Sequence, residues 1–312
     1  MVSGMNSDVD ITPVILTFNE EKNLAACLSS LSGFPRVFVV DSGSTDATPQ
    51  ICKEYGAQFV YHSFLNHATQ WQWALDHLEI ETDWVLALDA DYVVTPELRD
   101  RILREIPRLS SEVVGVYVRH LYQFGGGVIR FGGTKRTRMP IFRRKRARTD
   151  AGDLVDSRFV VNGKIVQWPE ALLEYNRNDD DSSVWLMKQD KYALRLAVEE
   201  ELRRRGLRCW TGKPDLFGTA DERFSWLRDR WLHMPLFVRP LAYFLYRYVF
   251  AGGFLDGRAG FLYAALQGFW LRLLIDVKTI ELRQLSLDDP SLLKISKQML
   301  QTRSGSVSQS QG

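Results

Sequence analysis

Short apolar runs alternate with helical patterns through roughly the first hundred residues of this 312-residue chain. The predicted strands are residues 11–16, 37–40, 57–61 and 84–88. Apolar residues at helical spacing predict the intervening helices, which are residues 23–31, 48–55 and 68–78. Apolar strands without alternation are typical of a sheet that is covered on both faces. The order of elements therefore predicts an α/β fold with a doubly wound, mostly parallel, Rossmann-like sheet built from βαβ units.

The pattern changes after residue 115. One further strand is predicted at 113–119, and residues 183–205 form an amphipathic helix that ends at Gly206. The apolar stripe of this helix consists of Met187, Leu194, Val198 and Leu202. We predict three parts of the chain: a sheet domain over 1–213, an appended aromatic and basic helical region over 214–290, and a partly disordered tail over 291–312.

The composition is that of a folded globular protein, with 45% hydrophobic and 25% charged residues. Forty Lys+Arg against 38 Asp+Glu give a formal net charge of +2. Three cysteines (Cys27, Cys52 and Cys209) are too few for a disulfide framework and match no zinc pattern, which favours a reducing compartment. We see no secretory signal in the polar first ten residues, and no uninterrupted apolar run that reaches the ~18–20 residues of a membrane span.

Polar segments follow three of the predicted strands at the point where each strand ends. They are residues 17–21, 41–46 and 89–91. In doubly wound sheets the ligand lies at the carboxyl ends of the strands, so these segments mark the predicted site. The two carboxylates of Asp89 and Asp91 suit a hard divalent cation that also takes phosphate oxygens. The structural alternative for this short motif is a helix cap or a surface loop.

The segment 41–46 (DSGSTD) also admits two readings. Asp41, at a strand end, could accept a hydrogen bond from a nucleobase N–H. Ser44 or Asp46 could instead cap the following helix. The two readings are compatible, because Asp46 can be structural while Asp41 binds a ligand.

Three segments, taken in order, carry a resemblance to a known family: VILTFNEEKNLAACLSSL, VFVVDSGSTDATPQICKEYGA and DWVLALDADYVVTPELRDRI. The chain resembles the family-2 inverting glycosyltransferases with the GT-A fold, and within them the bacterial lipopolysaccharide-core and exopolysaccharide enzymes. The late segment GGFLDGRAGFLYAALQGFW resembles the C-terminal part of those proteins. The resemblance implies a nucleoside-diphosphate-sugar donor, UDP-linked, a divalent cation (Mn²⁺ or Mg²⁺) and inversion at the anomeric carbon.

The resemblance assigns roles to individual residues. Asp89 and Asp91 match the metal and donor-ribose motif, and Asp91 is the stronger candidate for the metal ligand and for a catalytic role. The residues that match the nucleotide-sugar site are Thr17, Asn19, Glu20, Asp41, Ser42, His67, Gln70 and Asp89. The chain departs from the family at Gln72, where an Asn is usual, and at Trp71, where a basic residue is frequent.

The acceptor side matches less well. Related enzymes carry a Val-His-Glu-Arg segment after a basic loop, and this chain has VDSR at 155–158. Inversion needs a general base that takes the proton of the acceptor hydroxyl. Asp156 is the first candidate for this catalytic role, with Asp153 and Asp150 as rivals. The alternative is that these three acids only balance the arginines before them.

The stretch 130–148 contains nine Lys/Arg and no acid. It could hold the donor diphosphate, an anionic acceptor or lipid headgroups. A solvated loop is the simpler explanation. Nucleic acid is the generic alternative for clustered arginine, but the small net charge and the lack of an RNA-binding aromatic pattern argue against it.

Aromatic residues are interleaved with arginines from 207 to 274. This pattern is typical of helices in a membrane interface, where arginines snorkel to the surface. Breaks at Pro235, Pro240, Gly252 and Gly253 predict short helices, which are too short and too charged to span a bilayer. The alternative is a second helical layer on the sheet domain.

These observations together predict an inverting hexosyl- or N-acetylhexosaminyltransferase at the cytoplasmic face of the inner membrane, peripheral or monotopic. Its acceptor would be a lipid-linked glycan or lipopolysaccharide core, and no nucleic acid would be involved. Two alternatives stay open: a polyprenyl-phosphate sugar transferase, and a catalytically inactive membrane-bound assembly partner.

Overall fold

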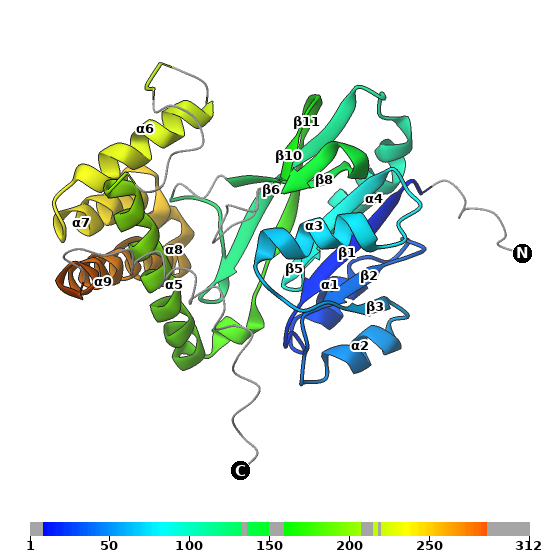
Figure 1. Ribbon diagram of the computed structural model, residues 1–312, viewed down its shortest axis with the longest axis horizontal. Helices are drawn as coiled ribbons and strands as arrows, with labels where there is room; N and C mark the ends of the chain where they lie inside the picture. The colour runs from blue at the N-terminus through cyan, green and yellow to red at the C-terminus, as the bar shows by residue number, and fades with distance from the viewer. Residues whose placement is uncertain (1–8, 133–135, 150–158, 207–214, 218–219, 286–312) are drawn as a thin grey trace, which may run out of the picture. The chain divides into compact units, whose positions relative to one another are not determined.

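The computed structural model describes residues 9–132, 136–149, 159–206, 215–217 and 220–285 (Figure 1). The chain divides into two compact units. The sheet unit contains residues 1–123, 134–180 and 300–312, and the helical unit contains 124–133 and 181–299. The domain boundary predicted at residue 213 lies outside the described residues and stays a prediction.

The first half of the sheet unit confirms the predicted βαβ order. Its elements are β1 (Ile11–Thr17), α1 (Leu24–Ser29), β2 (Phe38–Asp41), α2 (Thr48–Glu54), β3 (Gln58–Tyr61), α3 (His67–His77) and β4 (Trp84–Asp89). Strand β1 pairs in parallel with both β2 and β4, and β2 pairs in parallel with β3. Each observed strand or helix lies within one residue of its predicted bounds, apart from α1, which stops two residues early.

The second half of the sheet unit makes the sheet mixed. Its elements are β5 (Tyr92–Val94), α4 (Pro96–Glu105), β6 (Val113–Phe124), β8 (Arg136–Arg143), β9 (Ala147–Thr149), β10 (Phe159–Val161) and β11 (Lys164–Glu174). The strand order is β3-β2-β1-β4-β8-β6-β11-β5, and β9 and β10 pair separately. Strand β8 is antiparallel to β4 and β6, while β6 and β11 are parallel. The carboxyl ends of β1, β2, β4, β6 and β11 therefore lie at one edge of the sheet.

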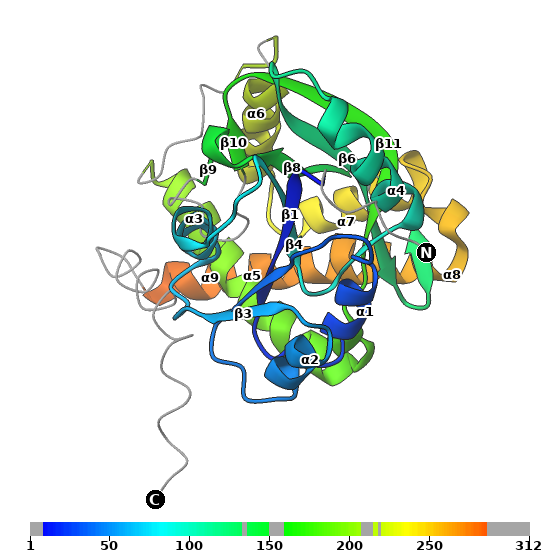
Figure 2. The ribbon, with the colours of Figure 1, turned by 90° about the vertical axis from the view of Figure 1, so that its right-hand side faces the viewer.

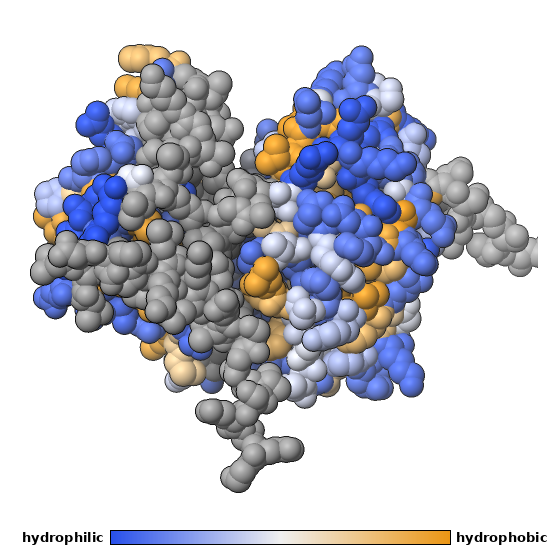
Figure 3. Space-filling view, in the orientation of Figure 1, coloured by the Kyte–Doolittle hydropathy of each residue, from blue (hydrophilic) through white to orange (hydrophobic). Residues whose placement is uncertain are grey.

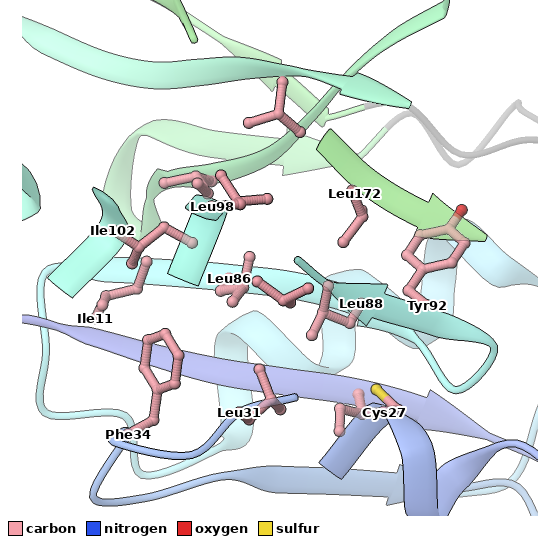
Figure 4. Close-up of a cluster of buried hydrophobic side chains, with 14 of the residues drawn as sticks. Ile11, Cys27, Leu31, Phe34, Leu86, Leu88, Tyr92, Leu98, Ile102 and Leu172 are labelled. Atoms are coloured by element: carbon pink, nitrogen blue, oxygen red, sulfur yellow. The ribbon is translucent and has the colours of Figure 1, made fainter. Parts of the chain in front are cut away.

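The core of the sheet unit lies on both faces of the sheet, as the apolar strands predicted. Alternate residues of β4 point to opposite sides: Leu86 and Leu88 join the cluster with α1 and α4, whereas Val85 joins the cluster with α3. Figure 4 shows Leu86 and Leu88 among the side chains of the first cluster, including Leu31 and Ile102. Helices thus cover both faces, with α3 on one side of the strands and α1 on the other (Figure 2).

The helical unit is built around two long helices. Its elements are β7 (Gly127–Ile129), α5 (Ser182–Arg204), α6 (Ala220–His233), α7 (Val238–Leu245), α8 (Gly257–Tyr263) and α9 (Leu271–Leu285), with π-helical turns at Tyr246–Phe250 and Ala264–Trp270. Small residues of α5, Ala193 and Ala197, pack in one cluster with Leu271 and Ile275 of α9. As predicted, α5 ends before Gly206, which has a positive φ of 68°.

The predicted burial of the apolar stripe on α5 is wrong for one residue. Met187 is 62% exposed, whereas Val198 and Leu202 are buried as expected. The buried stripe runs through the alanines instead, because their small side chains let the backbone of α9 approach closely. The periodicity of large apolar residues alone could not show this.

The expectation of snorkelling arginines in the aromatic region is wrong for Arg239 and Arg247. Arg239 is 2% exposed: its Nε donates to Asp276 Oδ1 at 2.7 Å, and its Nη2 lies 2.9 Å from Glu200 Oε2. Arg247 is 5% exposed, and its Nε donates to the carbonyl oxygen of Gly132 at 2.7 Å. Buried charge is tolerated here because each guanidinium has oxygen partners.

The expectation of short helical pieces is also wrong beyond Gly253. Residues Gly253–Gln284 form one helix of 32 residues whose best 18-residue window has a mean hydropathy of 1.2 and is 39% buried. In length and composition this helix could cross a membrane, although the core helix of a soluble protein passes the same test. The breaks near Pro235 and at Gly252 are confirmed, since Phe237 and Gly252 both adopt a positive φ, but the break at Pro240 is wrong because this proline lies in the first turn of α7.

Candidate active site

Asp41 anchors the loop that follows β2. Its carboxylate is 1% exposed and accepts hydrogen bonds from Thr17 Oγ1 at 3.0 Å, Gly43 N at 2.8 Å, and both N and Oγ of Ser44. The turn requires a glycine, because Gly43 has a φ of 96°. A carboxylate has about four acceptor positions, so these donors occupy the capacity of Asp41. A direct contact with a nucleobase N–H would require one of them to move, and that contact stays a prediction.

Asn19 and Asp46 join the loops after β1 and β2. Asn19 adopts a positive φ of 55°, accepts a hydrogen bond from Thr45 N at 2.8 Å and donates its own N–H to Ser44 Oγ at 2.8 Å. Asp46 accepts from Glu21 N and from Thr48 N, each at 3.0 Å. Burial alone would raise the pKa of Asp46, but these hydrogen bonds lower it. Asp46 therefore has the structural role that its position before α2 indicated.

Glu20 ties the first loop to the segment that follows β11. Its Oε2 accepts hydrogen bonds from Asn23 Nδ2 at 2.7 Å and Asn178 Nδ2 at 3.4 Å. Asn23 also donates to Asn176 Oδ1 at 3.1 Å and accepts from Arg177 N at 2.8 Å. This asparagine cluster holds two loops at the carboxyl edge of the sheet, and the sequence analysis did not find it.

The N-terminus of α3 supplies His67 and Gln70 to the same edge. The helix begins after Asn66, which forms a capping box with Thr69. His67 Nε2 lies 3.1 Å from Asp89 Oδ1. The amide of Gln70 is buried, with Oε1 at 2.7 Å from His62 Nδ1 and Nε2 donating to Ser42 Oγ at 3.4 Å.

The two departures from the family pattern have structural roles on α3. Trp71 is 2% exposed and packs edge-on against Phe159, with ring centroids 5.3 Å apart. Gln72 accepts a hydrogen bond from Thr149 N at 3.1 Å and donates to Asp76. Both side chains thus hold α3 against β9 and β10 of the same unit.

Asp89 and Asp91 lie at the turn between β4 and β5. Burial alone would raise the pKa of Asp89, but His67 and the Arg138 guanidinium lower it to about 2, so Asp89 is ionised at neutral pH. The carbonyl oxygen of Asp91 accepts a hydrogen bond from Tyr175 N at 2.9 Å, which joins this turn to the end of β11.

Glu174 and His120 form a second ionisable pair at this edge that the sequence analysis missed. Glu174 is the last residue of β11 and pairs in register with Tyr92 of β5. Its Oε2 lies 2.8 Å from His120 Nε2, and the His120 side chain is 3% exposed. Burial alone would raise the pKa of Glu174, but His120 and Arg138 lower it. A prediction of β11 as a strand would have placed Glu174 beside the turn that carries Asp89 and Asp91, which we call the acidic turn.

The acidic turn fits a divalent cation that arrives with phosphate groups. Asp89 and Asp91 provide hard carboxylate oxygens two residues apart. In the part of the chain that the structure describes, no group of three or more His, Cys, Asp or Glu is arranged to hold a metal alone. Magnesium-type sites use one or two carboxylates together with substrate phosphates. The family motif makes Asp91 the stronger candidate for the direct ligand, and Asp89 also contacts His67 Nε2 at 3.1 Å.

The candidate bases predicted after the basic run lie outside the described residues. This applies to Asp150, Asp153 and Asp156, so their roles stay predictions. Within the basic run, Arg143 pairs with Asp83, and Arg144 donates to the carbonyl oxygen of Ile80 at 2.6 Å. These two arginines are structural. The exposed basic residues at the end of the run are Lys145, Arg146 and Arg148.

Comparisons with known proteins agree with this geometry. The family described as Glycosyl transferase family 2 matches residues 12–179. The lipopolysaccharide core biosynthesis glycosyltransferase LpsC of Rhizobium meliloti is 30% identical over 161 residues, which cover 50% of this chain and 58% of LpsC. The uncharacterized glycosyltransferase RT0209 of Rickettsia typhi is 37% identical over 93 residues, 30% of this chain and 31% of RT0209. The chain thus matches little more than half of LpsC and a third of RT0209.

Among solved structures, residues 1–349 of S. aureus TarS are 18% identical to this chain. The superposition covers 88% of this chain and 92% of that one, with a TM-score of 0.44.

Proposed function

Because the chain belongs to glycosyl transferase family 2, we propose that it is an inverting glycosyltransferase that moves a hexosyl or N-acetylhexosaminyl group from a nucleoside-diphosphate sugar to an acceptor hydroxyl. One observation carries the proposal. The ionised Asp89, its partner His67 and Asp91 lie at the carboxyl end of β4, the edge where doubly wound sheets bind their ligands.

In this proposal the donor is UDP-linked and lies along the carboxyl edge from β2 to β4. The Asp41 loop forms the base end, and the acidic turn forms the diphosphate end. A divalent cation, Mn²⁺ or Mg²⁺, would stabilise the negative charge of the departing nucleoside diphosphate. Asp91 would hold that cation, while His67 keeps the Asp89 carboxylate in place through the contact at 3.1 Å.

Replacement of Asp41 by alanine should weaken donor binding by about tenfold or more, because its carboxylate fixes the loop that would form the base end of the donor site, and a hydrogen bond to a charged group contributes ~1.5–3 kcal/mol. Base contacts are made equally in the ground and transition states, so the turnover of bound donor should change little. Titration calorimetry with UDP and steady-state kinetics would measure the two effects.

Asp46→Ala is the matched control, because Asp46 supports the same loop from its other end. It should lower the thermal stability with a smaller effect on UDP affinity. Normal UDP affinity combined with a pure loss of turnover in Asp41→Ala would contradict the role in base recognition.

The candidates for the general base are Asp156, with Asp153 and Asp150 as its rivals, and Glu174. Asp156 takes the place of the histidine in the family segment, and Glu174 lies at the acidic edge with buried His120 behind it. In the transfer step, the acceptor oxygen bonds to the anomeric carbon while its proton passes to the carboxylate. The bond from that carbon to the diphosphate oxygen breaks, and its electron pair leaves with the nucleoside diphosphate.

Replacement of the true base by the matching amide, as Asp156→Asn or Glu174→Gln, should slow transfer to a hydroxyl by roughly 10²–10⁴-fold. Azide should restore the release of UDP in that variant, because azide attacks without losing a proton. Glu170→Gln is the control on the same strand, since in the described part of the chain Glu170 pairs with Arg101. If azide restores neither variant, both assignments are wrong.

We further propose that the acceptor is a lipid-linked glycan or lipopolysaccharide core, and that the protein acts at the cytoplasmic face of the inner membrane. The name of LpsC, which refers to lipopolysaccharide core biosynthesis, and the long apolar helix from Gly253 support this proposal. The alternatives predict other outcomes: a polyprenyl-phosphate sugar transferase uses the lipid phosphate itself, and an inactive assembly partner transfers nothing.

Supplying a radiolabelled UDP-sugar with either polyprenyl phosphate or truncated lipopolysaccharide separates these functions. We expect label in the lipopolysaccharide with the opposite anomeric configuration to the donor. Label in polyprenyl phosphate alone would favour the first alternative, and no label in either acceptor, across UDP-, GDP- and ADP-sugars, would favour the second.

A further inference from the structure

The segment 235–261 of the helical unit has an inverted distribution of polarity. Its charged residues are Arg239, Arg247, Asp256 and Arg258, and only Arg258 is exposed. The exposed large hydrophobic residues, which we call the apolar face, are Phe237, Val238, Leu241, Leu245, Tyr246, Val249, Phe250, Phe254, Leu255 and Phe261. By contrast, Figure 3 shows single apolar residues scattered over the mostly hydrophilic surface of the sheet unit.

The apolar face follows the helical period. Val238, Leu241, Leu245 and Val249 recur every three or four residues and lie on one side of α7 and its π-helical turn. The opposite side packs on the long helix, where the Phe244 and Phe269 rings have centroids 6.4 Å apart. The exposure of these residues therefore belongs to the folded helical unit.

Buried polar contacts fix this orientation. Arg239 is held by Asp276, which also accepts a hydrogen bond from Phe237 N at 2.7 Å at the start of α7. Arg247 donates to Gly132 and lies with its guanidinium carbon 4.8 Å from the centroid of the Tyr263 ring. Turning the apolar residues inward would expel both arginines from these partners, so the helix cannot rotate at low cost.

We propose that the apolar face inserts into one leaflet of a phospholipid bilayer that contains anionic lipids. The proposal deepens the membrane location given in the proposed function, but does not depend on sugar transfer. Aromatic and aliphatic side chains would enter the acyl boundary, and Tyr246 would keep its hydroxyl among the headgroups. Arg258, the single exposed charge of the segment, would contact lipid phosphate.

Charge and shape favour a bilayer over a second copy of the chain as the occupant. Arg258 is the exposed charged residue of the segment, and its acid, Asp256, is only partly exposed. If two copies paired through this surface, the two Arg258 side chains would lie near one another, and the segment would supply no fully exposed acid to balance them. Phe250 is 81% exposed at the end of its helical turn, before the break at Gly252. A fluid leaflet accommodates such a protruding ring without a complementary pocket.

Insertion into one leaflet also fits the interrupted chain better than a span. The helix is interrupted at Gly252, where φ is 73°, and the Tyr248 ring before the break packs against the Phe254 and Phe261 rings after it, with centroids 6.4 Å and 5.6 Å apart. Arg258 would be costly at the bilayer centre but can remain at its edge.

The test is flotation of the full-length protein with vesicles of phosphatidylcholine and phosphatidylglycerol, without any sugar donor. Leu245→Glu with Phe250→Glu should lower the partition coefficient by roughly tenfold or more, since a charged group replaces an exposed apolar side chain at two positions of the apolar face. Leu227→Glu is the matched control, because Leu227 is 58% exposed on α6 of the same unit and lies outside the apolar face. Arg258→Ala should weaken binding to the anionic vesicles and leave binding to pure phosphatidylcholine unchanged.

Three outcomes would overturn the proposal. Equal flotation of the Leu245/Phe250 variant and the Leu227 variant would exclude the apolar face. Absence of vesicle binding, combined with a wild-type dimer that this variant converts to a monomer, would assign the face to a second copy. Resistance of the bound protein to extraction with alkaline carbonate would indicate a span. A protein that floats as expected but transfers no sugar would leave this inference intact and contradict only the proposed function.

Discussion

Replacement of Asp91 by alanine should abolish sugar transfer, with a loss of roughly a thousandfold or more. Removing the ligand of a cation that stabilises the leaving diphosphate costs several kcal/mol of transition-state stabilisation. The fold should survive, because the residue lies in the turn beyond β4, outside the apolar clusters. Release of nucleoside diphosphate in Mn²⁺ would measure the first effect, and thermal unfolding would measure the second.

The matched control for Asp91→Ala is Asp100→Ala. Asp100 is an exposed acid on α4 that pairs only with its neighbour Arg99 in the described part of the chain. Its replacement should leave turnover unchanged. Removal of divalent cations by EDTA should reproduce the Asp91 phenotype in the wild-type protein. Near-normal turnover of the Asp91 variant, or indifference of the parent to EDTA, would show that the acidic turn holds no catalytic metal.

Replacement of Arg239 by leucine should destabilise the helical unit by about 3–5 kcal/mol. The guanidinium is 2% exposed, and its loss would leave the fully buried carboxylate of Asp276 without its cation. Urea unfolding followed by tryptophan fluorescence should detect the change, because the rings of Trp185 and Trp270 pack together within this unit, with centroids 5.8 Å apart.

Two further variants make the Arg239 result interpretable. Arg230→Leu removes an exposed arginine that lies over the Trp226 ring, and should change the unfolding free energy by less than ~1 kcal/mol. Asp276→Asn added to Arg239→Leu should recover part of the loss, since the fully buried unpaired charge is then removed and only the 12% exposed carboxylate of Glu200 lacks its cation. A destabilisation of Arg239→Leu as small as that of Arg230→Leu would refute the buried ion pair.

The sheet could be predicted wherever one local pattern was sufficient. Strand β4 is an apolar run that ends in Asp89, and every residue from Trp84 to Leu88 is buried in the structure. A structural role of Asp46 at the start of α2 could also be predicted, because Asp46 precedes the helix: its carboxylate accepts from Thr48 N, although the N-cap residue itself is Ala47. These features depend on neighbours in the sequence.

The features that the sequence did not reveal depend on distant partners. An arginine among aromatic residues can either snorkel to the surface or be buried. Arg239 is buried because it pairs with Asp276, which lies 37 residues away in the sequence. His120 and Glu174 meet only because β6 and β11 are adjacent strands. The sequence predicted that Asp41 could bind a ligand. In the structure, hydroxyl and N–H groups of Thr17, Gly43 and Ser44 occupy its acceptor positions, and residue spacing alone does not show these contacts.

Metal-dependent sugar transfer is tested most directly by measuring the release of nucleoside diphosphate from a panel of UDP-, GDP- and ADP-sugars, with Mn²⁺ and with EDTA. We expect release from at least one UDP-linked sugar nucleotide that depends on the metal, is lost in Asp91→Ala and is retained in Asp100→Ala. A folded wild-type protein that neither binds nor cleaves any member of the panel would contradict it.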